Sequence, residues 1–260
     1  MQSSQPCNRN YCGLLEKNIN NFFRDGFTKV DSFFTSNEIE ECKERLDVYI
    51  DKICPNLSKE DVFFENKNDK NTLKQLQRMH LYEPWFDTLF NGKTKQLAET
   101  LLDGEVITKN LQYFNKPPKI GKATPPHQDG YYFKLTPPKA LTMWLALDDV
   151  DEQNGCVRYV KGSHLRGMRN HSMTGTLGFS QGISSYGNED DIKNEIPISA
   201  KKGDLIVHDS MTIHRADQNL SDSKNRRALG FIFYSADSEE DNVSLKKYKT
   251  ELKDQQRGKI

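Results

Sequence analysis

Residues 141–147 have the sequence Leu-Thr-Met-Trp-Leu-Ala-Leu, a short apolar run that ends at two aspartates. An apolar segment of this length, bounded by polar turn residues, is typical of a β-strand. Six further strand-like segments follow Gly104, bounded by Gly, Pro or Asn/Asp clusters: Glu105–Ile107, Asn110–Asn115, Cys156–Val160, Glu195–Ile198, Asp204–His208 and Leu229–Tyr234. Many short strands at modest spacing predict a β-barrel or a β-sandwich.

The N-terminal third has a different pattern. Leu14–Asp25 has the apolar spacing of a helix and is followed by a short strand-like segment, Phe27–Val30. The run Thr35-Ser36-Asn37-Glu38 has the form of a capping box and predicts the start of a second helix. Further helical segments are expected within residues 72–102. Helices first and strands later predict a mainly β protein whose core has helices on one side.

We expect a single domain over residues 14–240, with a helical part to about residue 103 and a strand-rich core at 104–237. Residues 1–13 are polar and are predicted to be disordered, and residues 241–260 form a charged C-terminal tail. Residues 166–194 are rich in Gly and Ser and only weakly periodic. A loop of that length in a compact domain is usually a lid or a disordered insert.

Composition excludes several classes of function. Lys plus Arg and Asp plus Glu both number 37 in the 260 residues, so charge gives no reason to expect nucleic acid or an anionic membrane as a partner. No apolar run is long enough to span a bilayer, and the N-terminus has no signal-peptide core. The five cysteines form no CxxC pair. We expect a reduced, cytoplasmic protein, either monomer or homodimer.

Three residues are candidate metal ligands. His127 and Asp129 lie in the run Pro-Pro-His-Gln-Asp-Gly at 125–130, and His214 follows a later strand-like segment. Residues two apart on a strand point to the same side, so His127 and Asp129 can face a barrel interior together. Two imidazoles and one carboxylate can hold one face of an iron(II) ion and leave the opposite face open. Taken alone, a His-x-Asp pattern is weak evidence for a metal site, because its histidine can equally well be an ordinary core or surface residue.

The sequence around these ligands runs in ordered blocks: Pro-His-Gln-Asp-Gly at 126–130, the strand-like run to Asp149, Asn-Gly-Cys at 154–156, Val-Lys-Gly-Ser-His at 160–164, Gly-Asp at 203–204, His-Arg-Ala-Asp-Gln-Asn-Leu-Ser at 214–221, and Arg-Arg-Ala at 226–228. In this order and spacing the chain resembles the phytanoyl-CoA dioxygenase family of iron(II)- and 2-oxoglutarate-dependent oxygenases. The resemblance extends from about Asn21 to Asp237.

The resemblance implies a double-stranded β-helix core (a jelly roll, cupin-like), with iron(II) held by His127, Asp129 and His214, and 2-oxoglutarate and O₂ as cosubstrates. It also implies an arginine after the distal histidine that anchors 2-oxoglutarate, because a guanidinium donates two parallel hydrogen bonds to a carboxylate. The Arg-Arg-Ala sequence aligns best with Arg226 in this role. Neighbours on a strand face opposite ways, so only one of Arg226 and Arg227 points inward, and the alignment can slip by one.

Further pocket positions follow from the same resemblance. Gln112, Asn115, Gln128 and Trp144 match positions that line the cosubstrate pocket in relatives. On a regular strand Gln128 would point away from its neighbours and needs a local bend, and Trp144 also fits the barrel core. Ala216 stands where the family often has a Ser or Thr that helps to bind the cosubstrate.

The resemblance implies hydroxylation of an unactivated C–H bond of a small organic substrate, with release of succinate and CO₂. Asp129 favours this over halogenation, because related halogenases lack the carboxylate ligand. Tyr131 and Tyr132 follow the ligand pair and could contact the substrate or simply pack. Two other functions use the same residues: a zinc-dependent hydrolase and a non-catalytic jelly-roll binding protein. The identity of the substrate, and desaturation or another outcome in place of hydroxylation, are left open.

Overall fold

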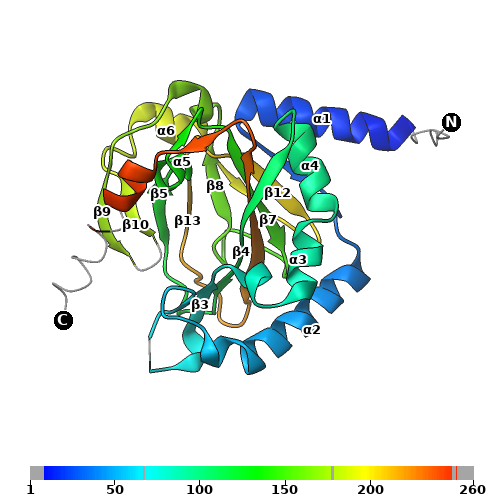
Figure 1. Ribbon diagram of the computed structural model, residues 1–260. Helices are drawn as coiled ribbons and strands as arrows, with labels where there is room; N and C mark the ends of the chain where they lie inside the picture. Colours follow the sequence, from blue (N-terminus) through cyan, green and yellow to red (C-terminus); the bar gives the residue numbers. More distant parts are fainter. Residues whose placement is uncertain (1–8, 67, 177–178, 248–249, 251–260) are drawn as a thin grey trace.

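Two antiparallel sheets form the centre of the molecule. The computed structural model describes residues 9–66, 68–176, 179–247 and 250. The larger sheet has seven strands in the order β1-β12-β7-β14-β4-β3-β2, and the smaller has four in the order β11-β8-β13-β5. A buried cluster joins residues of both sheets, among them Trp144 from the larger and Tyr159 from the smaller. The two sheets therefore pack face to face around a common interior (Figure 1).

The strands of the larger sheet are β1 (Phe27–Val30), β2 (Val62–Phe64), β3 (Leu73–Leu76), β4 (Val106–Lys116), β7 (Ala140–Ala146), β12 (Leu205–Asp209) and β14 (Arg226–Ser235). Those of the smaller sheet are β5 (Thr124–His127), β8 (Val157–Val160), β11 (Glu195–Ile198) and β13 (His214–Ala216). Two short pairs lie outside them: β9 (His171–Thr176) with β10 (Phe179–Ile183), and β6 (Leu135–Thr136) with β15 (Glu239–Glu240). The helices are α1 (Arg9–Asp25), α2 (Ser36–Lys52), α3 (Pro84–Phe90), α4 (Lys93–Leu101), α5 (Gly130–Phe133) and α6 (Glu189–Asn194).

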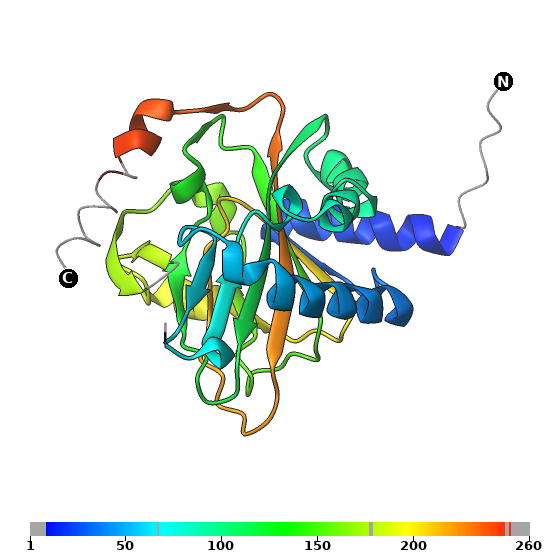
Figure 2. The same ribbon diagram turned by 60° about the horizontal axis from the view of Figure 1, so that its bottom comes forward.

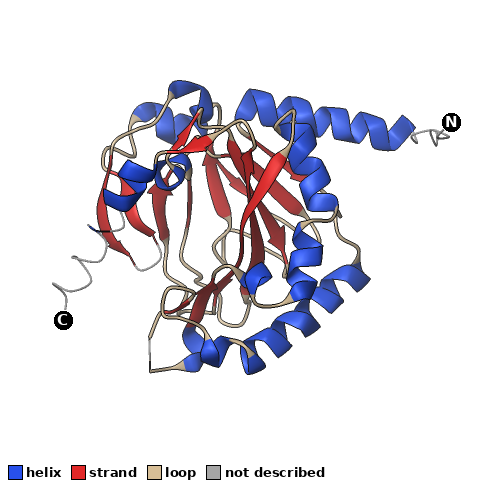
Figure 3. Cartoon of the chain, viewed as in Figure 1, coloured by secondary structure: helices blue, strands red, loops and turns tan. Residues whose placement is uncertain are grey.

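Side-chain alternation divides the larger sheet into two faces. On β7, Leu141, Met143 and Leu145 belong to a cluster that also contains the apolar faces of α2, α3 and α4, whereas Trp144 and Ala146 belong to the cluster between the sheets. These helices lie along one side of the sheet, and the smaller sheet lies on the other (Figures 1 and 2). The arrangement confirms the predicted β core with helices on one side. In Figure 3 the helices are blue and the strands red, so the helical layer can be told apart from the sheets.

Several predicted elements occur where the sequence pattern places them. Thr35 forms the predicted capping box with Glu38 at the start of α2, and β1 and β11 have the predicted bounds. Other predictions were wrong. The segments predicted as separate strands at 105–107 and 110–115 belong to one continuous strand, β4, which begins at Val106 and leaves Glu105 out. Leu76, within the range expected to be helical, lies in β3. Helix α1 begins at Arg9, so residues 9–13 of the segment predicted to be disordered are helical; residues 1–8 lie outside the described residues.

Residues 166–194 were predicted to be an unstructured lid or insert, and the structure corrects this. Strands β9 and β10 form an antiparallel hairpin, and α6 follows. The hairpin packs on β5. Gly182 of β10 lies so close to this strand that an added Cβ atom would be 3.4 Å from Pro125 Cβ. A salt bridge of 2.7 Å joins Arg169 to the buried carboxylate of Asp191 in α6. Contacts with the rest of the fold therefore order a segment whose own periodicity is weak.

The C-terminal segment is helical at residues 242–247. Residues 251–260 of the predicted charged tail lie outside the described residues. Within the described part of the chain, no helix is long and apolar enough to cross a membrane.

Candidate metal centre

The three predicted ligands come together at one end of the space between the sheets. His127 ends β5 and His214 begins β13, and the two are direct cross-strand partners. Asp129 follows as the residue before α5, with helical backbone angles, so a strand-to-helix turn and not strand alternation brings it beside His127. Its Oδ1 atom lies 3.4 Å from His127 Nε2 and 3.8 Å from His214 Nε2. The ligand atoms all lie within 4.8 Å of one another, a set that could hold a metal ion.

Backbone carbonyls orient both imidazoles. Nδ1 of His127 lies 2.8 Å from the carbonyl oxygen of Pro125, and Nδ1 of His214 lies 3.0 Å from that of Thr212. A carbonyl oxygen only accepts hydrogen bonds, so each Nδ1 must carry the proton and donate it. Each Nε2 then keeps its lone pair and points toward Asp129. Metal-binding histidines use the same arrangement.

The second oxygen of Asp129 is held by Thr142 and His208. Thr142 Oγ1 donates to Asp129 Oδ2 at 2.6 Å, and His208 Nε2 lies 3.1 Å from the same oxygen. Nδ1 of His208 is 3.0 Å from the hydroxyl of Tyr159. If His208 donates through Nε2, its Nδ1 accepts from Tyr159, which completes a buried chain. Sequence reasoning missed this role of His208, because nothing in its apolar strand indicates the contact with Asp129.

Protonation states at the site suit a cation. Burial alone would raise the pKa of the Asp129 carboxyl, but His214, His127 and His208 hold it well below its usual range. Burial, with His127 and His208 nearby, holds the pKa of His214 well below its ordinary value. Asp129 is therefore ionised and His214 neutral, which are the states in which these groups bind metals.

Arg226 and Arg227 face opposite sides of the larger sheet. Arg226 is buried, its Nε donates to the carbonyl of Gly155 at 3.2 Å, and its guanidinium lies 5.2 Å from the ring centre of Trp144. Among the described residues no carboxylate lies within ion-pair distance of it, and burial lowers the pKa of Arg226 to about 10. Arg227 instead donates to both oxygens of Asp148, at 2.9 and 2.8 Å.

Gln112 and Trp144 also face the interior. Gln112 accepts a hydrogen bond of 2.7 Å from Gln75, whose own Oε1 is buried without a partner. Between the two on the sheet lies Gly230, the cross-strand partner of both. A Cβ at Gly230 would approach the ring of Phe114 to 2.7 Å, so only glycine leaves room for that ring.

Asn115 does not face this interior. The register of β4 with β14 pairs Asn115 with Arg227 and Lys116 with Arg226. Directly opposite residues share a face, so Asn115 lies on the helix side, where its amide donates to the carbonyl of Leu73 at 2.9 Å. The predicted pocket position is taken by Lys116, which sequence reasoning missed.

Gln128 is fully buried, but its side chain turns away from the ligands. Its amide nitrogen donates to the carbonyls of Gly167 and Met211, and its Oε1 accepts from the backbone of Arg169. Its backbone N–H donates to Nε2 of His171 at 3.1 Å. All hydrogen-bonding groups of the carboxamide are thus used to tie neighbouring segments together, in place of the predicted contact with a cosubstrate.

The two tyrosines after the ligand pair point in different directions. Tyr131 stacks on His171 with ring centres 4.2 Å apart and lines an open cleft of about 520 Å³. The rings of Tyr132 and His127 form a T-shaped pair with their centres 5.9 Å apart, and the Tyr132 hydroxyl donates to the carbonyl of Gln181 at 2.7 Å. Tyr132 is therefore the one beside the metal ligands.

The donor set fits iron, and a buried arginine without an acid fits the far carboxylate of a dicarboxylate cosubstrate. A jelly roll with these features defines the class of iron- and 2-oxoglutarate-dependent oxygenases. The sequence model of the phytanoyl-CoA dioxygenase (PhyH) family matches residues 22–228, so the chain belongs to this family. It is an enzyme of the 2-oxoglutarate-dependent dioxygenase class, with iron and 2-oxoglutarate as cofactor and cosubstrate.

Curated relatives match over most of their length. Phytanoyl-CoA dioxygenase 1 of Oryza sativa is 28% identical over 206 residues, covering 74% of this chain and 72% of the relative. Phytanoyl-CoA dioxygenase of Arabidopsis thaliana is 27% identical, covering 86% and 90%.

Solved structures show the same fold. The epimerase SnoN, in complex with Fe³⁺, α-ketoglutarate and nogalamycin RO, has a TM-score of 0.70 at 22% identity, covering 87% of this chain and 86% of SnoN. EctD from S. alaskensis, with 2-oxoglutarate and 5-hydroxyectoine, has a TM-score of 0.69 at 16% identity, covering 84% and 75%.

Proposed function

We propose that this enzyme hydroxylates an unactivated C–H bond of a small organic substrate, converting 2-oxoglutarate and O₂ to succinate and CO₂. The observation that carries the proposal is the convergence of His127, Asp129 and His214, whose ligand atoms lie within 4.8 Å of one another. One oxygen atom of O₂ enters the product as hydroxyl and the other enters succinate, so the reaction balances without a further reductant.

Each side chain has a stated task in this proposal. His127 and His214 present unprotonated Nε2 atoms, and Asp129 presents Oδ1 while Thr142 and His208 hold Oδ2. Bound iron supplies the oxidation chemistry, and the protein supplies placement. Arg226 binds the distal carboxylate of 2-oxoglutarate. A zinc hydrolase would have no use for a buried arginine without an acid, which favours the oxygenase function.

Substrate contacts are proposed for Tyr132, and for Tyr131 where it lines the open cleft. Tyr132 lies beside His127, so a substrate that approaches the metal passes its ring. The hairpin of β9 and β10 packs over β5 and holds the Tyr132 hydroxyl through Gln181. We propose that this hairpin helps to shape the substrate site.

The test begins without oxygen. Iron(II) and 2-oxoglutarate are added to the protein, and a weak metal-to-ligand charge-transfer band is expected in the visible spectrum. Succinate release is then screened across candidate small molecules in air, with Asp129→Ala as the inactive control. A product 16 mass units heavier than its substrate supports hydroxylation. If neither the band nor succinate is seen under any condition, the oxygenase function is excluded. If succinate forms but the product has the same mass as its substrate, hydroxylation is excluded and the oxygenase function stands.

A further inference from the structure

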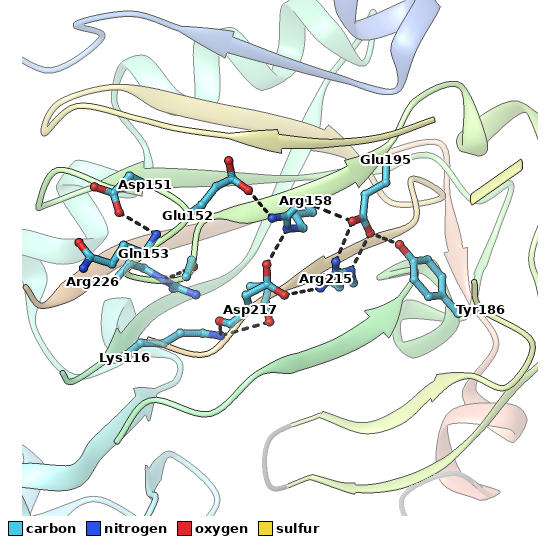
Figure 4. Close-up of polar contacts among 12 residues, drawn as sticks. Lys116, Asp151, Glu152, Gln153, Arg158, Tyr186, Glu195, Arg215, Asp217 and Arg226 are labelled. Carbon is cyan, nitrogen blue, oxygen red and sulfur yellow. Dashed lines mark hydrogen bonds and ion pairs between the residues drawn. The ribbon is translucent and has the colours of Figure 1, made fainter. Parts of the chain in front are cut away.

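Lys116 is buried next to Arg226 at the end of the larger sheet. The two residues are direct partners across β4 and β14, and both are at most 5% exposed. Like charges placed directly opposite each other on a sheet destabilise it. Figure 4 shows the two side chains close together. In the part of the chain that the structure describes, no carboxylate lies within ion-pair distance of either.

The partners that Lys116 does have are backbone carbonyls. Its ammonium donates to the carbonyl oxygen of Asp217 at 2.6 Å, and that of Ala216 is 3.4 Å away. Burial, with Arg226 and Lys74 nearby, holds the pKa of Lys116 well below its ordinary value. Lys74 itself has a carboxylate partner, Glu65, at 3.3 Å. Lys116 and Arg226 are therefore the two buried basic side chains here that have no carboxylate partner among the described residues, and a bound anion would stabilise their charged forms.

We propose that Lys116 acts with Arg226 as a second cation that binds the distal carboxylate of 2-oxoglutarate. The inference rests on the proposed function and extends it to a specificity-determining residue. Lys116 lies beside Ala216, the position where the sequence lacks a hydroxyl group. A lysine from β4, a strand of the opposite sheet, supplies a donor in its place, and its charge selects a carboxylate over an uncharged group.

The experiment compares two ligands that differ only at the distal end. 2-Oxoglutarate carries the carboxylate, and 2-oxopentanoate has a methyl group there. Dissociation constants are measured by calorimetry without oxygen on the iron(II) protein, so turnover is not needed. Lys116→Met is expected to weaken 2-oxoglutarate binding about 10- to 100-fold, the loss of one hydrogen bond to a charged group. Binding of 2-oxopentanoate should change less than about threefold by the same reasoning.

Two further variants separate binding from folding. Lys109→Met removes a lysine from the same strand whose ammonium pairs with Glu240, and should leave both affinities unchanged. Lys116→Gln keeps a donor for the Asp217 carbonyl and removes the charge, so it carries the test if Lys116→Met fails to fold. Unfolding temperatures are measured for all variants.

A Lys116→Gln protein that binds 2-oxoglutarate as the wild type does would overturn the role of Lys116. If Arg226→Met loses affinity at the same time, the proposed function stands and Lys116 only caps the carbonyls of β13. A wild-type iron(II) protein that does not bind 2-oxoglutarate at all would overturn the proposed function as well. Weakened 2-oxoglutarate binding with unchanged 2-oxopentanoate binding supports the second cation.

Discussion

The outer face of the smaller sheet and the interior between the two sheets differ in whether their arginines are paired with acids of the protein. On the outer face, Arg215 donates to both oxygens of Glu195 at 2.6 and 2.7 Å, and Arg158 contacts Asp217 at 2.6 Å (Figure 4). In the interior, Arg226 of the larger sheet contacts a backbone carbonyl and an aromatic ring, and no carboxylate of the described residues lies within ion-pair distance of it. The protein thus neutralises its outer arginines with its own acids. The difference separates charges that stabilise the fold from charges that are left for a ligand.

The strongest test of this comparison removes each of the two adjacent arginines in turn. Arg226→Met should weaken 2-oxoglutarate binding at least about 100-fold, because it removes a two-pronged donor to a buried carboxylate. Arg227→Met is the matched control: it leaves Asp148 without its partner and should lower stability by about 1 kcal/mol with little change in affinity. Calorimetry of cosubstrate binding and urea unfolding measure the two effects. The opposite ranking of affinities would show that Arg227 is the anchor.

The sequence was enough to predict the metal ligands because their pattern is local and their order distinctive. The preference for Arg226 needed only strand alternation and the resemblance. Strand alternation also places Gln112 and Asn115 on opposite faces, so the two could not both line the pocket. Lys116 was missed because it lies one residue beyond the predicted strand 110–115, and its pairing with Arg226 follows from the register of β4 against β14, which no local pattern encodes. The β9–β10 hairpin was not predicted for a similar reason, because it packs against Pro125, which is distant from it in the sequence.

A second prediction concerns Asp129, the carboxylate among the three candidate metal ligands. Its Oδ2 is held by Thr142 and His208, and in the described part of the chain Asp129 is not paired with Arg226. His208→Phe keeps the ring and removes the hydrogen bond to Asp129 Oδ2, and should weaken metal binding about 10- to 100-fold. Tyr159→Phe removes only the contact behind His208 and should have a smaller effect.

Cobalt(II) or iron(II) affinity, measured without oxygen or cosubstrate, tests this role directly. Unchanged metal affinity in His208→Phe would mean that Thr142 alone is sufficient to orient Asp129. Cosubstrate affinity of the metal-saturated variant should match that of the wild type, because Arg226 lies outside this chain of hydrogen bonds.

The smallest effect is expected on the outer face. Glu195→Gln keeps the shape of the side chain and removes the charge that faces Arg215, so stability at pH 7 should fall by about 1 kcal/mol. Glu152→Gln is the matched control, because Glu152 contacts Arg158 from an exposed position (61% exposed side chain) and should change stability less. Neither should alter 2-oxoglutarate affinity. A clear loss of affinity in Glu195→Gln would mean that the outer network contributes to the interior site and would break the comparison.

The dependence of this effect on pH follows from the same carboxylate. Burial alone would raise the pKa of Glu195, but hydrogen bonds from Arg215 and Tyr186 hold it below its ordinary value of 4.5. A group with a lowered folded-state pKa contributes stability above its unfolded pKa and loses it as the pH falls through the folded value. The stability difference between wild type and Glu195→Gln should therefore be largest at neutral pH and shrink as the solution is acidified below 4.5. Urea unfolding at a series of pH values measures it, and a difference that grew on acidification would show that Glu195 is not held as a carboxylate by Arg215.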